Sequence, residues 1–249
     1  MSTDSSLQGR RILITGATSG LGAHFASVFA RRGASVILTG RREALLEEQV
    51  RCFINQGVSA SYIAADVNDS ESRKHIAQTS GEIDVLVNNA GIAIDKPATA
   101  QTEADWDSVI DTNLRSMFFL AQEMLEGLKA RSGAVINIAS ILGLRQAGSV
   151  MPYAVSKAGV IQLTKVLALE WARYGVRVNA LAPGYIETEL NSEFWSTPAG
   201  LAMIKRIPQR RLGRLQDLDG PVLLLASDAS AYMTGSVIVV DGGHVTSSL

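Results

Sequence analysis

The sequence has little of what supports a disulfide framework, a metal centre or a membrane segment. Its one cysteine, Cys52, cannot form an internal disulfide, and its three isolated histidines lack metal-ligand spacing. No apolar run approaches membrane-spanning length, and the polar segment 1–10 lacks the hydrophobic core of a signal peptide. We therefore expect a cytoplasmic protein with no metal ion and no membrane attachment.

An excess of one charge is also missing. The sequence has 23 Lys and Arg against 24 Asp and Glu, and its basic residues form no sustained stripe. A nucleic-acid partner is therefore not expected. The length of 249 residues fits one large α/β domain or two small ones. Because we find neither a linker nor a repeat, we expect a single domain over residues 1–249.

Short apolar runs alternate with helical patterns along most of the chain. This alternation predicts parallel strands joined by helices, in a sheet buried on both faces. Ligands of such sheets bind at the carboxyl ends of the strands. The expected strands cover residues 11–15, 35–39, 60–64, 83–87, 133–138, 176–182 and 236–240; the expected helices cover 20–32, 42–55, 70–79, 102–129, 153–174 and 216–226.

A glycine cluster follows the first strand and opens the first helix, with the spacing G-x-x-x-G-x-G. Glycine lets backbone amides approach a ligand closely, and the helix start favours a pyrophosphate. The alternative is a simple turn, since the spacing differs from the common G-x-G-x-x-G fingerprint. The candidate cofactor contacts here are Gly16, Thr18, Ser19, Gly20, Leu21 and Gly22.

Arg41 and Arg42 follow the second strand, where a dinucleotide fold meets the adenosine ribose. Arginine there accommodates a 2′-phosphate, so we expect NADP(H) to be preferred, with NAD(H) left open. The alternative is that both arginines begin a solvated helix. Asp66 and Val67 end the third strand and could contact the adenine ring, although Asp66 could equally cap the next helix.

Further polar residues follow the central strands. Asn88 to Gly91 end the fourth strand, so Asn89, Ala90 and Gly91 are expected to line the ligand. Asn113 lies among apolar neighbours in a helical pattern, where a buried amide needs a partner, either a local backbone group or a water of the site. Ser140 ends the fifth strand without a nucleophile motif around it, which favours a hydrogen-bonding role.

Tyr153 and Lys157 stand four residues apart at the start of a long helical pattern, and therefore on one face of the helix. An ammonium group beside a phenol stabilises the phenolate and lowers its pKa, which suits acid/base catalysis. The alternative is a tyrosine that packs against a lysine stem.

The segment from about 184 to 213 has no clear strand period and is typical of a lid or a binding loop. Its apolar residues, Phe194 and Trp195 among them, could form a small amphipathic helix over a pocket, or else a subunit contact. We expect its basic residues to be solvated or ion-paired rather than to hold a substrate: Lys205, Arg206, Arg210, Arg211 and Arg214.

Taken together, these motifs resemble the short-chain dehydrogenase/reductase family over nearly the whole chain. The resemblance rests on the order and spacing of the glycine cluster from Thr15, Asn88 to Gly91, Asn113, Ser140, Tyr153 with Lys157, Pro183-Gly184, and Val240 to Gly243. It implies a Rossmann-type, doubly wound, parallel seven-stranded sheet, an NAD(P)-dependent alcohol dehydrogenase or ketoreductase, and a homotetramer.

The resemblance also implies roles for single residues. Tyr153 would be the acid/base, Lys157 would hold the nicotinamide ribose and lower the phenol pKa, Ser140 would orient the carbonyl, and Asn113 would anchor a proton relay. Arg41 matches the position that holds the phosphate of NADP. The remaining matched cofactor contacts are Ile186 and Thr188.

The expected substrate pocket is mostly apolar with one cation, which favours a fairly apolar ketone or alcohol as the small-molecule substrate. Alternatives are a 3-oxoacyl-thioester reductase, a sugar dehydrogenase such as a gluconate dehydrogenase, and a non-catalytic NADP-binding regulator. A regulator is disfavoured because all four catalytic positions are kept. The candidate lining residues, some of which could instead face the core or another subunit, are Ile141, Leu142, Arg145, Met151, Tyr185, Phe194 and Trp195.

Overall fold

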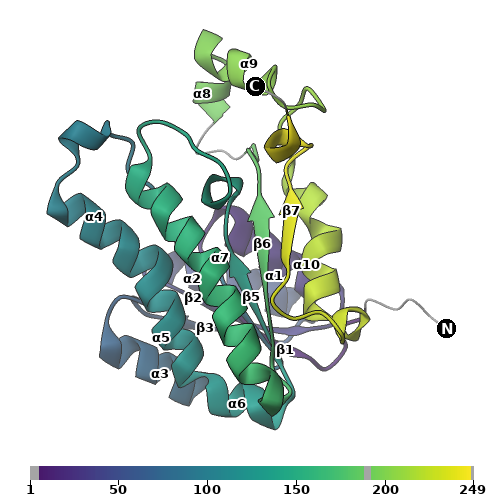
Figure 1. Ribbon diagram of the computed structural model, residues 1–249. Coiled ribbons are helices and arrows are strands. Elements are labelled where there is room, and N and C mark those ends of the chain that lie inside the picture. Colours follow the sequence, from purple (N-terminus) through teal and green to yellow (C-terminus); the bar gives the residue numbers. More distant parts are fainter. Residues whose placement is uncertain (1–5, 188–191, 248–249) are drawn as a thin grey trace.

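The computed structural model describes residues 6–187 and 192–247, which form a parallel sheet flanked by helices (Figure 1). The strand order is β3-β2-β1-β4-β5-β6-β7, and all neighbouring pairs are parallel. This confirms the predicted Rossmann-type, doubly wound, seven-stranded sheet. The strands are β1 (Arg11–Thr15), β2 (Ser35–Gly40), β3 (Ala60–Ala64), β4 (Val85–Asn88), β5 (Ala134–Ile138), β6 (Arg177–Pro183) and β7 (Val237–Val240).

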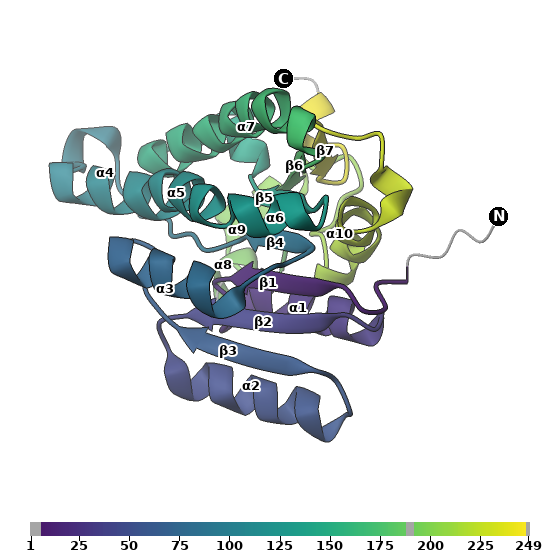
Figure 2. The same ribbon diagram turned by 90° about the horizontal axis from the view of Figure 1, so that it is seen from below.

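The sheet separates two hydrophobic cores. Ile12 and Ile14 of β1 belong to one core and Leu13 to the other, as the alternation of side chains along a strand requires. Because both cores pack on the same sheet, the chain forms one domain. One face is covered by α1 (Gly20–Arg31), α2 (Glu43–Asn55) and α10 (Asp219–Ala226), and the other by α3 (Ser70–Ser80), α5 (Ser116–Glu123), α6 (Leu125–Ala130) and α7 (Met151–Trp171) (Figure 2).

The helix predicted over residues 102–129 is not one continuous α-helix, which corrects the sequence-based expectation. After α4 (Glu103–Ile110) comes a π-helical turn over residues 111–115, followed by α5 and α6. Single π turns inside helices occur frequently at functional sites. The side chain of Asn113, which is fully buried, lies in this turn.

The part of the chain that follows β6 and carries α8 and α9 lies beyond the carboxyl ends of the strands (Figure 1). We call residues 184–213 the lid. It holds two short helices, α8 (Ser192–Trp195) and α9 (Pro198–Ile204), in place of the single small helix that was expected. Its two ends are tied together, because Gly213 N donates to Tyr185 O and Glu187 N donates to Gly213 O, both at 2.9 Å.

Among the helices of residues 6–187 and 192–247, none is both long enough and apolar enough to cross a membrane.

Candidate active site

The turn between β1 and α1 depends on glycine at two places. Gly16 has a φ of 64°, and a Cβ on it would lie 2.8 Å from Cα of Ala90. A Cβ on Gly22 would lie 2.3 Å from the carbonyl oxygen of Gly16, so α1 begins directly against the turn. The N-cap residue Ser19 makes no side-chain bond to the helix, and the positive end of α1 faces this turn.

A first cavity of about 350 Å³ adjoins this turn and the ends of β2, β3 and β4. Of the predicted cofactor residues, those lining it are Gly16, Thr18, Ser19, Leu21, Arg41, Arg42, Asp66, Val67, Asn89, Ala90 and Gly91. Asn68 and Thr112 also line it and were not predicted; Asn68 Nδ2 donates to Thr112 Oγ1 at 2.9 Å. One feature of the sequence indicated that Asn68 lines this cavity, which is its position directly after Asp66 and Val67.

The two arginines occupy different environments within this cavity. Arg42 Nη2 donates to Thr18 Oγ1 at 2.6 Å and to Ser19 Oγ at 2.9 Å, which connects the end of β2 to the glycine turn. Arg41 makes no side-chain hydrogen bond or ion pair to the described residues. Both guanidinium groups are exposed and would suit a phosphate.

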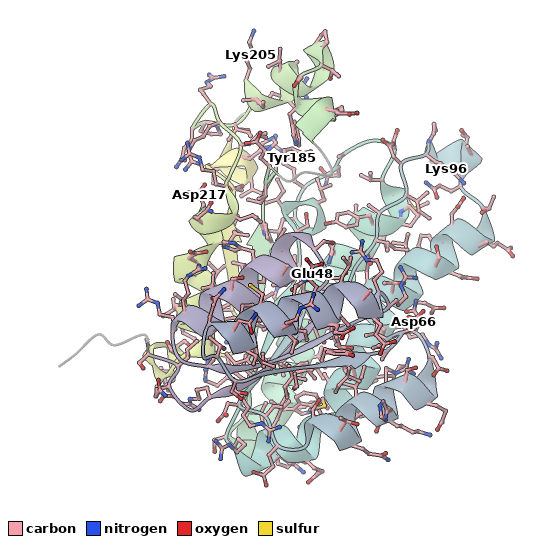
Figure 3. The ribbon with its side chains drawn as sticks, turned by 180° about the vertical axis from the view of Figure 1, so that it is seen from behind. Glu48, Asp66, Lys96, Tyr185, Lys205 and Asp217 are labelled. Carbon is pink, nitrogen blue, oxygen red and sulfur yellow. The ribbon has the colours of Figure 1, made fainter. Side chains whose placement is uncertain are left out.

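Asp66 does not cap the following helix. Its Oδ1 accepts from Asn68 N at 3.0 Å, whereas Asp69 caps α3 by accepting from Ser72 N at 2.7 Å. The cap alternative is thereby excluded, and Asp66 lies at the rim of the first cavity, at the edge of the molecule seen in Figure 3.

Asn89 locks the end of β4 to the glycine turn. Its Nδ2 donates to the carbonyl oxygens of Thr15 and Gly16 at 2.9 and 3.2 Å. In return, Thr15 Oγ1 accepts from the backbone N–H groups of Asn89 and Ala90, both at 2.9 Å. These bonds hold the backbone of both segments in one arrangement without a ligand.

A second cavity, of about 510 Å³, continues from the first. The two share Leu21, Asn89 and Gly91 in their linings. The second cavity also contains the predicted residues Gly20, Ser140, Tyr153, Lys157 and Ile186, and residues that were not assigned to it: Ile92, Ala93, Ile138, Ala139, Val150, Pro183 and Gly184.

Lys157 is held at the base of the second cavity, where its side chain is buried. Its Nζ donates to the carbonyl oxygen of Ile138 at 2.7 Å and lies 5.6 Å from the centroid of the Tyr153 ring. Burial lowers the pKa of Lys157 from 10.5 to about 8. The ammonium form therefore still predominates at pH 7, by roughly ten to one.

The expected lowering of the Tyr153 pKa by Lys157 is wrong for this structure. Burial of the phenol raises its pKa and outweighs a hydrogen bond from Ser140, which acts in the opposite direction, while Tyr185 adds a smaller upward shift. Lys157 Nζ is directed to the carbonyl of Ile138 and makes no hydrogen bond to the phenol oxygen. The phenol therefore stays protonated at neutral pH, as a proton donor requires.

Asn113 connects the π turn to the catalytic helix. Its Oδ1 accepts from Ile92 N at 2.8 Å, and its Nδ2 donates to Ile92 O at 2.9 Å and to Ser156 Oγ at 3.0 Å. Ser156 Oγ in turn donates to the carbonyl oxygen of Tyr153 at 2.7 Å. Asn113 thus serves the backbone of Ile92, which is distant in sequence, and its Oδ1 would lie 3.2 Å from a Cβ on Gly91 at the cavity wall.

The predicted substrate residues fall into two groups. Ile141, Leu142, Tyr185 and Trp195 line the second cavity, and Trp195 packs 5.2 Å from the Tyr185 ring. Arg145 instead lines a third cavity, which adjoins the second at Ile141, Leu142 and Tyr185.

Two residues expected at the substrate lie to the side of these cavities. Phe194 is 43% exposed and packs edge-on against Trp195 at 4.9 Å. Met151 lines none of these three cavities, and the preceding Val150 lines the second one. Thr188 lies outside the described residues.

The joined first and second cavities fit a dinucleotide. The two cavities meet at Leu21, Asn89 and Gly91. Arg41 and Arg42 line the first cavity after β2, where the phosphorylated ribose of NADP is expected. No group of three or more His, Cys, Asp or Glu side chains in the described part of the chain could hold a metal ion. The chemistry at the site falls to a phenol, a hydroxyl and an amine.

The chain matches known proteins over nearly its full length. The family model described as Enoyl-(Acyl carrier protein) reductase matches residues 16–245. A gluconate 5-dehydrogenase from Gluconobacter oxydans is 36% identical over 97% of both chains, and a 3-oxoacyl-[acyl-carrier-protein] reductase from Chlamydia pneumoniae is 37% identical over 96% of this chain and 98% of its own. The crystal structure of a gluconate 5-dehydrogenase from Burkholderia cenocepacia in complex with NADP and tartrate superimposes with a TM-score of 0.93, at 36% identity over 98% of each chain.

Proposed function

This chain belongs to the short-chain dehydrogenase/reductase family, and on that premise we propose that it interconverts a ketone and a secondary alcohol with NADP(H). One observation carries the proposal. Ser140, Tyr153 and Lys157 line a cavity that continues into the glycine-turn cavity. A hydride carrier in the first cavity can therefore present its reactive ring to a carbonyl beside the phenol.

We propose that the cofactor binds to residues that line the first and second cavities. The glycine turn and the N-terminal end of α1 would hold the pyrophosphate. Arg41 and Arg42 would hold the 2′-phosphate, and Lys157 would hold the nicotinamide ribose. The bound nicotinamide supplies or accepts the hydride. The solved relative in complex with NADP supports the choice of the phosphorylated cofactor.

The protein supplies the proton and the orientation. In reduction, the hydroxyl groups of Ser140 and Tyr153 donate hydrogen bonds to the substrate carbonyl oxygen, where negative charge develops. Tyr153 then gives its proton to the alkoxide. Lys157 holds the nicotinamide ribose beside the phenol, and Asn113 positions α7 through Ser156.

The substrate side is less polar than the cofactor side. Aliphatic and aromatic groups of Ile141, Leu142, Tyr185 and Trp195 surround the place of the carbonyl, which supports a fairly apolar ketone or alcohol next to the reacting carbon. The relatives named as a gluconate dehydrogenase and as an acyl-carrier-protein reductase support two alternatives, a sugar-acid or a 3-oxoacyl-thioester substrate. Fold alone does not choose among them.

We also propose that residues 184–213 act as the substrate-binding lid and that the enzyme is a homotetramer. The lid assignment is supported by Tyr185, Ile186 and Trp195, which reach the second cavity from this segment. The tetramer follows from the family resemblance, and sedimentation equilibrium would measure the subunit number directly.

The proposed function is tested by following nicotinamide absorbance with NADPH and, separately, with NADH against cyclic ketones, aryl ketones, 3-oxoacyl thioesters and keto-sugars. Tyr153→Phe keeps the ring but removes the transferable proton, so kcat should fall roughly 10²–10⁴-fold while NADPH affinity is kept. Tyr232→Phe makes the same change at a fully exposed ring and should leave kcat unchanged. A Tyr153→Phe enzyme with most of its turnover would disprove the assignment.

A further inference from the structure

The third cavity, of about 390 Å³, is lined by two arginines and by no carboxylate. We call it the basic annex; its lining residues are Ile141, Leu142, Arg145, Gln146, Ala147, Gly148, Tyr185, Met203, Arg206 and His244. Two guanidinium groups and an imidazole lie among them, and no Asp or Glu does. Neither arginine forms an ion pair with a described carboxylate. Such a cavity attracts an anion.

Arg145 is fixed in place by the C-terminal part of the chain. Its Nη1 donates to the carbonyl oxygen of His244 and, at 2.9 Å, to Ser247 Oγ. Its backbone N–H donates to Ile141 O at 2.8 Å. The half-buried guanidinium is therefore preorganised, which lowers the entropy cost of binding an anion.

Arg206 reaches the annex from the lid, just after α9. The charges of Arg145 and Arg206 both lower the pKa of Tyr185, which burial raises, and both contribute to the lowered pKa of His244. Tyr185 and His244 lie ring to ring, with centroids 5.4 Å apart. The two guanidinium groups therefore act on the same pair of rings.

His244 adds a polar atom without a partner. Its ring is buried, at 9% exposure, and among the described residues Nδ1 has no hydrogen-bond partner. A buried polar atom normally has a partner, so an unpaired one in a residue that lines the annex favours a polar occupant there. Burial and the two arginines lower the pKa of the imidazole and outweigh the opposing effect of Asp241, which favours the neutral ring with one donor and one acceptor.

Tyr185 connects the annex to the catalytic phenol. It lines both the second cavity and the annex, and it raises the pKa of Tyr153 through their electrostatic interaction. Figure 3 shows Tyr185 at the base of the lid. A substrate with its carbonyl at Tyr153 can therefore extend along Tyr185 towards Arg145 and Arg206.

We propose that the annex binds a carboxylate of the substrate, so that the enzyme acts on an oxo acid or the corresponding hydroxy acid. This inference rests on the proposed function and names its substrate class: the reacting ketone lies among the apolar residues, and the acid group lies in the annex. Guanidinium groups bind carboxylates through paired, charge-assisted hydrogen bonds. Arg206, expected from the sequence to be solvated or paired, becomes a specificity-determining residue.

The test compares straight-chain oxo acids with their methyl esters. The series runs from 4-oxopentanoate to 7-oxooctanoate, with the ketone always at the penultimate carbon, and NADPH oxidation gives kcat and KM for each compound. We expect one chain length at which kcat/KM of the acid exceeds that of its ester roughly tenfold or more, mainly through KM. Esters that match their acids at every length would overturn the proposal.

Arg206→Gln is the decisive variant, because the Arg206 side chain makes no hydrogen bond or ion pair to described residues and its loss breaks no fold contact. It should raise KM for the preferred acid roughly tenfold and leave the ester unchanged, and Arg206→Lys should restore part of the loss. Lys205→Gln is the matched control, because this neighbouring side chain is exposed and points away from the molecule (Figure 3). An equal rise in KM for acid and ester in Arg206→Gln would contradict a role in charge recognition.

Failure of the proposed function would look different. In that case no compound of any class would oxidise NADPH. Calorimetric titration of the NADPH-bound protein with the oxo acids and esters would then test carboxylate binding in the annex independently of turnover. Preferential binding of an acid, lost in Arg206→Gln, would support the annex. Equal binding of acids and esters, or none, would overturn it.

Discussion

The first cavity collects residues that directly follow β1, β2, β3 and β4, whereas the second cavity and the annex collect residues from the loop after β5, from α7, from the lid and from the C-terminal end. The surroundings of the first cavity, which we call the cofactor half, are held by bonds between side chains and backbone, such as those between Thr15 and Asn89. The lid is tied at its base by two backbone bonds and packs through aromatic rings. Cofactor binding is therefore part of the fold, and substrate choice can change without disturbing the sheet.

The largest effect should come from a methyl group placed in the cofactor half. In Gly22→Ala the new Cβ would meet the Gly16 carbonyl at 2.3 Å, so the turn must shift. We expect a loss of about 1–3 kcal/mol in unfolding free energy, together with loss of NADPH binding. Denaturant unfolding and fluorescence titration measure the two quantities.

Gly148→Ala is the matched change in the second cavity and the annex, which we call the substrate half. No atom lies within 4 Å of its added Cβ, and Gly148 has no positive φ. Stability should stay the same or rise by roughly 0.4–1 kcal/mol, because alanine restricts the unfolded chain. Equal destabilisation by the two substitutions would remove the contrast between the halves.

Lys157 lies where the halves meet, and its burial makes stability depend on pH. Its pKa is about 8 in the fold and 10.5 in the unfolded chain. Between these values the unfolded chain binds more protons, so unfolding free energy rises with pH, by on the order of 3 kcal/mol over the interval. Below pH 8 both states are protonated and the burial penalty is fully present.

Denaturant unfolding from pH 7.5 to 10.5 tests this, with the rise taken as the difference between wild type and Lys157→Met. Lys165→Met, an exposed site on the same helix, should keep the wild-type slope. Parallel profiles for wild type and Lys157→Met would show that the amine is not shifted.

The sequence predicted the parts of the structure that depend on local pattern. Contiguous β-branched runs predicted the parallel strands, because a strand buried on both faces must be apolar at every position. The glycine turn was also predictable, because its spacing between a strand and a helix is a local pattern, although the atoms that crowd Gly16 belong to Asn89 and Ala90 after β4. The ends of parallel strands meet at one edge, so the cofactor residues could be grouped without coordinates.

Features that depend on distant packing were not predictable. Asn113 in the π turn bonds Ile92 and Ser156 on another helix, and neither contact leaves a mark on helical periodicity. The upward pKa shift of Tyr153 comes from burial by the assembled cavity rather than from its neighbour four residues away. Arg206 and His244 meet across 38 residues of sequence, and no spacing rule connects them.

A further effect that we expect concerns cofactor choice and falls within the cofactor half alone. Arg42→Ala removes a guanidinium that contacts Thr18 and Ser19 at the cavity rim. NADPH affinity should fall roughly tenfold, because one charge-assisted phosphate contact is lost, while NADH affinity changes little. Arg41→Ala, measured in parallel, tells whether the unpartnered arginine carries the larger share. Arg51→Ala removes an exposed charge elsewhere on α2 and should alter neither affinity. If Arg42→Ala and Arg41→Ala weaken both cofactors equally, the arginines support the turn rather than read the 2′-phosphate, and preference for NADP must come from another part of the first cavity.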